Sequence, residues 1–133
     1  YNVIFAWDEL KKIAAENLDA ARRRLMDILC NYAGYRKCVP ILVFDAYRVK
    51  GAGREQETWH NLHVIYTREA ETADMFIERA THELAKNHRV RVVSSDGAEQ
   101  IIILGNGALR VSARAFEREV RAVEAEIREF LDQ

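Results

Sequence analysis

Apolar residues recur with helical spacing in three stretches of the chain. The first stretch covers residues 18–32, and Asn17 stands directly before it as an N-cap. The second begins at Ala73, and the third follows Ser112, which predicts a cap for the last helix. The three apolar stripes are Leu18, Ala21, Leu25, Ile28, Leu29 and Tyr32; Ala73, Phe76, Ile77, Ala80 and Leu84; and Phe116, Val120, Val123, Ile127, Phe130 and Leu131.

Short apolar runs between these helices predict strands. The run Val39–Phe44 is apolar at successive positions, which favours a central parallel strand covered by helices on both faces. Further strands are predicted at 63–66 and 90–93, and residues 1–5 look like the end of another. Residues 47–61 are polar, contain glycine and have no clear period, so we expect a mobile loop there.

Strands and helices therefore alternate along the chain. This order predicts an α/β fold with a mainly parallel central sheet and helices on both faces. No internal repeat or linker divides the 133 residues, so we expect one domain. With 49% hydrophobic residues, the chain can form an ordinary core.

Charge and cysteine content narrow the functional classes. The 20 basic and 21 acidic residues nearly balance, which excludes a chain that binds nucleic acid by bulk positive charge alone. No apolar run approaches the about 20 residues of a membrane span, and no secretory signal opens the sequence. We therefore expect a cytoplasmic protein without membrane association, whose two cysteines, Cys30 and Cys38, are reduced thiols.

Three acidic residues fall where an α/β fold binds ligands. Asp45 ends one predicted strand, Asp96 follows another, and Asp74 lies in the first turn of the helix after a third. Ligands of open α/β sheets bind beyond the carboxyl ends of the strands, so these carboxylates are expected to converge. Converging carboxylates repel one another unless a cation lies between them, and their oxygen atoms suit Mg²⁺ or Mn²⁺.

Two more acids lie close to Asp74 in the sequence. Glu78 follows one helical turn later on the same face, and Glu71 stands just before the helix. A structural interpretation also exists for each acid. An acid in a first turn favours the helix dipole, and an Asp at a strand end often starts a turn. Spacing alone leaves both interpretations open.

Five short segments, spread over essentially the whole chain, form a pattern together. They are Tyr1-Asn2-Val3-Ile4; Val43-Phe44-Asp45-Ala46; Glu71-Thr72-Ala73-Asp74 with Ile77-Glu78; Ser94-Ser95-Asp96; and Gly107-Ala108-Leu109-Arg110-Val111-Ser112-Ala113. In this order they resemble the YacP-like NYN domains of the PIN-like nuclease superfamily. The resemblance implies a single NYN nuclease domain over residues 1–133, folded as a PIN-like three-layer sandwich.

The resemblance also implies an activity, a metal-dependent endoribonuclease. Within the family, the chain is similar to bacterial ribosome-associated enzymes that cleave mRNA in the ribosomal A site. The implied reaction is hydrolysis of an RNA phosphodiester by water bound to Mg²⁺ or Mn²⁺, with mRNA and the ribosome as partners and no nucleotide cofactor. The implied metal ligands are Asp74, Asp45 and Asp96, and the supporting residues are Asn2, Glu78 and Glu71.

The sequence departs from the family pattern at its start. The family has Asp-Gly ahead of Tyr-Asn, and that Asp is a main metal ligand, whereas this sequence begins at Tyr1. We therefore expect the chain to be trimmed at its N-terminus, with the first acid present in the parent protein.

Basic residues near the acids are candidate RNA contacts. The predicted loop carries Arg48, Lys50 and Arg54, which would hold phosphates, although a solvated surface loop explains them equally well. Arg110 lies in a family segment and is a candidate phosphate contact. The alternative function is a non-catalytic RNA- or ribosome-binding module with an incomplete acidic pocket. A phosphatase of the Asp-x-Asp type is disfavoured because Tyr47 stands where its second acid belongs.

Overall fold

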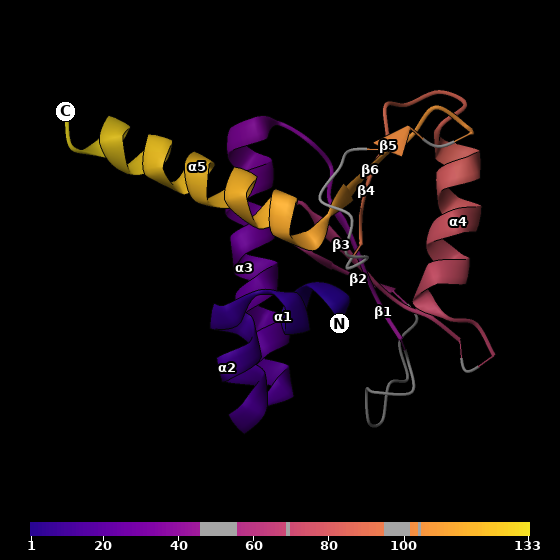
Figure 1. Cartoon of the computed structure of the whole chain (residues 1–133), viewed down its shortest axis with the longest axis horizontal. Helices are drawn as coiled ribbons and strands as arrows, with labels where there is room; N and C mark the ends of the chain where they lie inside the picture. The colour runs from indigo at the N-terminus through magenta and orange to yellow at the C-terminus, as the bar shows by residue number, and fades with distance from the viewer. Residues whose placement is uncertain (46–55, 69, 95–101, 104) are drawn as a thin grey trace.

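The computed structural model describes residues 1–45, 56–68, 70–94, 102–103 and 105–133. The elements, in chain order, are α1 (Asn2–Ala6), α2 (Asp8–Glu16), α3 (Leu18–Arg36), β1 (Ile41–Phe44), β2 (Gln56–Trp59), β3 (Leu62–Tyr66), α4 (Ala73–Leu84), β4 (Arg91–Ser94), β5 (Ile102–Ile103), β6 (Leu109–Ser112) and α5 (Ala113–Leu131). Helices α1, α2, α3 and α5 lie on one side of the strands and α4 on the other (Figure 1). The chain is therefore an α/β protein, as predicted.

The described strands form two three-stranded sheets, with the orders β1-β3-β2 and β4-β6-β5. Each sheet has one parallel pair, β1 with β3 or β4 with β6, and one antiparallel pair. This differs from the single, mainly parallel sheet expected from the sequence. Strand β1, predicted to be central, is an edge strand of its sheet within the described part of the chain. An apolar run is typical of burial by helices, and it does not specify how many strands flank it.

The N-terminal residues form helices, so the prediction of a strand over residues 1–5 was wrong. Ile4, Trp7 and Leu10 are all fully buried. Ile4 belongs to α1, Leu10 to α2 and Trp7 to the extended junction between the two helices, and all three enter one hydrophobic cluster. A strand running through Ile4 and Trp7 would place them on opposite faces. A five-residue apolar run is too short for periodicity alone to separate helix from strand.

Two further differences concern polar segments. Residues 56–59 belong to the predicted loop but form β2, which pairs with β3 through the backbone from Gln56 opposite Ile65 to Trp59 opposite Leu62. Backbone pairing with a neighbouring strand outweighs the weak local propensity of this polar segment. Strand β6 was likewise not predicted. The remainder of the predicted loop, residues 46–55, lies outside the described residues.

The three predicted helices are confirmed, together with two of their caps. Asn17 Oδ1 accepts a hydrogen bond of 3.0 Å from the Ala20 N–H at the start of α3, and Ser112 Oγ accepts one of 3.1 Å from the Ala115 N–H at the start of α5. The apolar stripe of α5 ends earlier than expected. Phe130 and Leu131 are 72% and 71% exposed, because the last turns of α5 reach past α3 (Figure 1).

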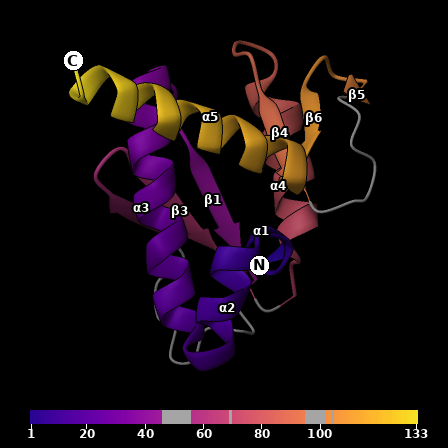
Figure 2. The same cartoon turned by 60° about the vertical axis from the view of Figure 1, so that its left-hand side comes forward.

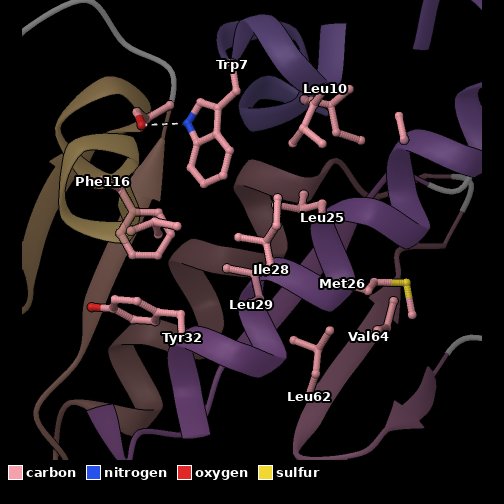
Figure 3. Close-up of a cluster of buried hydrophobic side chains, with 14 of the residues drawn as sticks. Trp7, Leu10, Leu25, Met26, Ile28, Leu29, Tyr32, Leu62, Val64 and Phe116 are labelled. Atoms are coloured by element: carbon pink, nitrogen blue, oxygen red, sulfur yellow. Dashed lines mark hydrogen bonds between the residues drawn. The ribbon is translucent and has the colours of Figure 1, made fainter. Parts of the chain in front are cut away.

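The hydrophobic core lies between α3, α5, the N-terminal helices and the inner faces of the strands (Figures 2 and 3). Trp7 from the α1–α2 junction, Leu25 from α3 and Phe116 from α5 meet there. Leu62 and Val64 reach the same cluster from β3. Helix α4 packs against β1 on the far side. Its predicted stripe is the less exposed side of the helix but is only half-buried.

The two cysteines, Cys30 and Cys38, are free thiols, as predicted. None of the helices in the described part of the chain has the length and apolar character that crossing a membrane requires.

Candidate functional site

A cleft of about 210 Å³ lies between α4 and the sheet that contains β4 and β6. Its polar lining comes from α1, α4, both strands and the turn before β6. Among the described residues, the polar ones are Asn2, Asp74, Glu78, Thr81, Ser94, Asn106 and Arg110. The cleft therefore brings together four of the predicted site residues, Asn2, Asp74, Glu78 and Arg110, from three different elements.

Two side chains fix the start of α4. Asp45 follows the last residue of β1, and its Oδ1 accepts a hydrogen bond of 2.6 Å from the backbone N–H of Ala73. Thr72 caps the same helix, accepting a hydrogen bond of 3.1 Å at Oγ1 from the Met75 N–H. Both bonds satisfy N–H groups that have no partner within the helix. Asp45 thus ties α4 to the carboxyl end of β1 and is not among the residues that line the cleft.

The acidic wall of the cleft consists of Asp74 and Glu78. Both side chains belong to α4, four residues apart, and therefore share one face. Asp74 lies in the first helical turn, where the positive end of the helix dipole stabilises a carboxylate. The spacing in the sequence predicted that these two carboxylates share a helix face.

The basic group of the cleft is Arg110 of β6. Its Nε donates a hydrogen bond of 2.9 Å to Ser94 Oγ on the neighbouring strand β4. The parallel register places Val92 opposite Arg110 and Ser94 opposite Ser112, so Arg110 and Ser94 lie on the same face of the sheet. The bond orients a guanidinium group beside the acidic wall, and a guanidinium is well suited to hold a phosphate.

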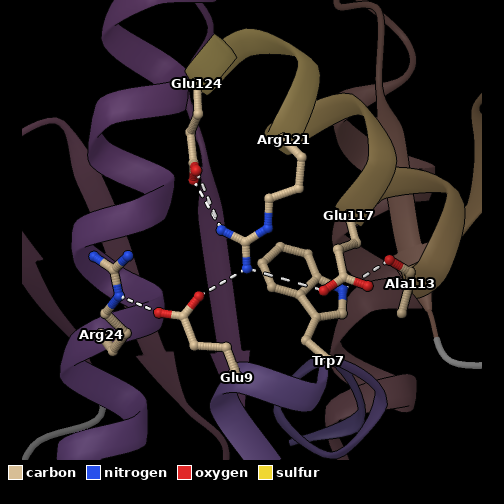
Figure 4. Close-up of polar contacts among 7 residues, drawn as sticks. All are labelled: Trp7, Glu9, Arg24, Ala113, Glu117, Arg121 and Glu124. Atoms are coloured by element: carbon tan, nitrogen blue, oxygen red, sulfur yellow. Dashed lines mark hydrogen bonds and ion pairs between the residues drawn. The ribbon is translucent and has the colours of Figure 1, made fainter. Parts of the chain in front are cut away.

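Asn2 reaches the cleft because α1 is held at both ends. Trp7, fully buried at the end of α1, donates a hydrogen bond of 2.8 Å from its indole N–H to the carbonyl oxygen of Ala113 (Figure 4). At the other end, the Tyr1 ring contacts Phe44 of β1 at 4.9 Å between ring centroids.

An ion-pair network joins α2, α3 and α5 on the outside of the core. Arg121 of α5 forms an ion pair of 2.8 Å with Glu9 of α2, and Glu9 pairs with Arg24 of α3 at 2.7 Å (Figure 4). The pKa of Glu9 is below its ordinary value, mainly because Arg24 donates a hydrogen bond to its carboxylate. Partial burial raises this pKa, and a second hydrogen bond, from Arg121, lowers it further. The network therefore holds α2, which follows α1 directly after Trp7, against α3 and α5.

Other predicted site residues lie elsewhere. Glu71 forms an ion pair of 2.9 Å with Arg79 and does not line the cleft. Asp96 and the loop cations Arg48, Lys50 and Arg54 lie outside the described residues.

Sequence reasoning missed Ser94 and Asn106 as cleft residues. Ser94 is the first residue of the Ser-Ser-Asp segment, in which only Asp96 has the carboxylate chemistry that predicts a metal ligand. Asn106 stands between two glycines in a turn, and such a turn has no functional signal of its own.

The donor chemistry of the cleft fits a hard divalent cation. Asp74 and Glu78 supply carboxylate oxygens, and Asn2 supplies an amide oxygen, the atoms that Mg²⁺ and Mn²⁺ prefer. Within the part of the chain that the structure describes, no three His, Cys, Asp or Glu side chains are grouped closely enough to hold a metal ion. The proposed third acid, Asp96, stands outside that part.

An α/β fold whose cleft carries acids on one wall and an arginine beside them is typical of a nuclease-like domain. Residues 1–133 match the YacP-like NYN domain, and the chain belongs to this family. The resemblance inferred from the sequence segments is thereby confirmed.

Individual relatives agree with this assignment. The chain is 42% identical over 128 residues to YacP, an uncharacterized protein of Bacillus subtilis (strain 168), a match that covers 96% of this chain and 75% of the relative. It is similar to the crystal structure of Rae1 (YacP) from Bacillus subtilis, with a TM-score of 0.81 and 40% identity over 99% of this chain and 76% of that one. A mutant of the same protein gives a TM-score of 0.79, 38% identity and coverage of 97% and 76%.

Proposed function

We propose that this chain is a metal-dependent endoribonuclease that hydrolyses phosphodiester bonds of mRNA in association with the ribosome. One observation supports it most strongly: Asp74, Glu78 and Arg110 line one cleft in a member of the NYN family. Carboxylates that bind a cation and an arginine that binds a phosphate are the two requirements of phosphodiester hydrolysis without a covalent intermediate.

Within this proposal, Asp74 is the principal ligand for Mg²⁺ or Mn²⁺, and Glu78 and Asn2 contribute from the same cleft. Asp96 is the proposed further acid. Asp45 is a positioning residue. It accepts a hydrogen bond from the Ala73 N–H and so positions the helix turn that carries Asp74. When bound, a divalent ion neutralises charge on the phosphate and lowers the pKa of water.

The remaining residues orient the substrate. Arg110, held by Ser94, binds a non-bridging phosphate oxygen beside the acidic wall. The net charge of −1 gives little long-range attraction for free RNA. A substrate delivered by a larger partner, the ribosome, suits such a chain better than free RNA in solution.

The test is an mRNA cleavage assay with translating ribosomes. It compares the chain with its Asp74→Asn variant, each with Mg²⁺ or Mn²⁺ and with a chelator, and with and without Asp-Gly ahead of Tyr1. Glu83→Gln is the matched control, because Glu83 lies on the same helix with a 73% exposed side chain and outside the cleft. We expect Asp74→Asn and chelation each to reduce cleavage at least about 100-fold, and Glu83→Gln to leave it unchanged.

Two results contradict the proposal. If cleavage persists in chelator and in Asp74→Asn, the acidic residues of the cleft do not take part in the reaction. Ribosome binding without cleavage by any form favours the alternative, a non-catalytic RNA- or ribosome-binding module.

A further inference from the structure

Thr81 is the one residue that α4 buries, and it lines the cleft with only 5% of its surface exposed. A threonine inside a helix commonly donates its hydroxyl hydrogen to the carbonyl oxygen four residues earlier, here that of Ile77. Within the described part of the chain, the Thr81 hydroxyl bonds neither this oxygen nor any other group. Its hydrogen-bonding capacity is therefore unused by the fold.

The same hydroxyl is accessible from the cleft. Among the described residues, no side-chain nitrogen or oxygen atom is both fully enclosed and without a hydrogen-bond partner. Since the Thr81 Oγ1 atom has no partner, part of its surface must be accessible, and the cleft is the space that Thr81 lines. A molecule that enters the cleft can bond this hydroxyl, which both donates and accepts.

Threonine at this position costs the helix stability. A β-branched side chain loses freedom inside a helix, and an unbonded hydroxyl among apolar groups loses its hydration. Valine has the same shape and would avoid the second cost. A residue that breaks such a local rule without a compensating contact is typical of a functional site.

The end of the cleft around Thr81 is largely apolar. Ile77 lines it one turn earlier on α4, and Val92 lines it from β4. The cationic group lies toward the other end, because Arg110 donates its hydrogen bond to Ser94, the last residue of β4. Apolar walls suit the neutral part of a nucleotide rather than its phosphate, which would lose its hydration there.

We propose that this end of the cleft binds the nucleoside of a nucleotide whose phosphate lies at Arg110, and that the Thr81 hydroxyl forms a hydrogen bond with that nucleoside. The inference rests on the proposed function for its ligand class, RNA, and adds the direction in which a nucleotide lies in the cleft. Ribose hydroxyls and base edges both offer a partner for a hydroxyl group.

The size of the cleft agrees with a single nucleotide. Its volume of about 210 Å³ is below the roughly 300–1,000 Å³ of pockets that enclose a whole small ligand. The cleft therefore has room for no more than one nucleotide.

The test measures binding of small ligands, which needs neither cleavage nor a ribosome. UMP, dUMP and inorganic phosphate are titrated with Mg²⁺ into the chain and into Thr81→Val, which replaces the hydroxyl by a methyl group. Kd values are taken from NMR shifts of the Val92 and Arg110 backbone amides. We expect Thr81→Val to weaken UMP binding roughly fivefold, the effect of one hydrogen bond, and to leave phosphate binding unchanged.

The deoxynucleotide locates the hydrogen bond on the nucleoside. If Thr81→Val weakens binding of UMP alone, the partner of Thr81 is the 2′-hydroxyl, which dUMP lacks. If it weakens binding of both nucleotides equally, the partner lies elsewhere on the nucleoside.

Two further variants and a stability measurement separate binding from folding. Thr81→Ser keeps a hydroxyl and should retain most of the UMP affinity. Thr58→Val is the matched control, because Thr58 is exposed on β2 and lies outside the cleft, and it should change no Kd. The Tm of Thr81→Val should equal or exceed that of the parent chain, since the lost hydroxyl has no bond in the fold.

Unchanged UMP affinity in Thr81→Val, an equal loss for inorganic phosphate, or a loss that comes with a lowered Tm would each overturn the nucleoside subsite. The absence of UMP-induced shifts in the parent chain would do the same. Intact mRNA cleavage alongside any of these results overturns the subsite alone. UMP binding that depends on Thr81, in a chain that does not cleave mRNA on ribosomes, overturns the proposed nuclease activity and leaves the subsite in place.

Discussion

Helices α3 and α4 lie on opposite sides of the strands and differ in how deeply they are buried. Of the 19 residues of α3, seven are buried, whereas α4 buries only Thr81 among its 12. Helix α3 packs among α2, α5 and β3, and α4 rests on β1 and lines the cleft. Buried packing is therefore concentrated on the α3 side of the strands, whereas the candidate chemistry lies on the α4 side. The chemistry lies on the side with fewer buried contacts, where local opening costs less.

The largest expected effect is the loss of Trp7 from the packed side. Trp7→Ala removes a fully buried ring and its hydrogen bond to Ala113, which should lower the free energy of unfolding by about 3–5 kcal/mol. The matched variant on the cleft side, Ile77→Ala, removes a half-buried side chain and should cost about 1 kcal/mol. Urea unfolding at constant m-value measures both. Equal losses in the free energy of unfolding would show that the α3 side and the α4 side contribute equally to stability.

A smaller effect is expected from the anchor of α4. Asp45→Ala removes the charge-assisted hydrogen bond to the Ala73 N–H, worth about 1.5–3 kcal/mol. Amide hydrogen exchange should accelerate in α4 and stay unchanged in α3. Asp45→Asn is the control, since its amide oxygen still accepts the bond. Uniform acceleration across both helices would mean that α4 does not open independently.

The smallest effect concerns an ion pair on the packed side. Arg91 of β4 donates two hydrogen bonds to the Glu119 carboxylate of α5, and Tyr32 donates a third. The hydrogen bonds from Arg91, more than its charge, hold the pKa of Glu119 below its ordinary value. The resulting stability is present above the unfolded pKa and is lost as the pH falls through the folded pKa.

Glu119→Gln should therefore flatten the acid limb of the stability profile. At about pH 7 its cost should stay below about 1 kcal/mol, because Arg91 is partly exposed and its charge is screened by solvent. Urea unfolding over a series from about pH 7 to about pH 3 provides the measurement. An identical acid limb in variant and parent would assign the pH dependence to other carboxylates.

Much of the fold could be predicted because local sequence determines it. Helix α3 starts at Asn17 and α5 at Ser112, and each cap bonds to a backbone group only three residues away. Strand β2 could not be predicted, because its polar residues are ordered by pairing with β3. Helix α1 could not be predicted either, since the burial of Trp7 at its end involves α5, more than 100 residues away in sequence.

The candidate site likewise contains residues that the sequence could predict and residues that it could not. Asp74 and Glu78 share a helix face that spacing alone predicts, and a family segment pointed to Arg110. Asn106 is a cleft residue only because a turn and a helix meet in space. The anchoring bond of Asp45 depends on the spatial meeting of β1 and α4.

The hydrogen bond from Trp7 to Ala113 also has a consequence for folding during translation. The two residues are 106 positions apart, and at about 5–20 residues per second the ribosome needs roughly 5–20 s to make the intervening chain. Throughout that interval Trp7 lacks its partners on α5, Ala113 and Phe116. The nascent chain thus presents an unfinished apolar surface for seconds, a period in which chaperones have time to bind it.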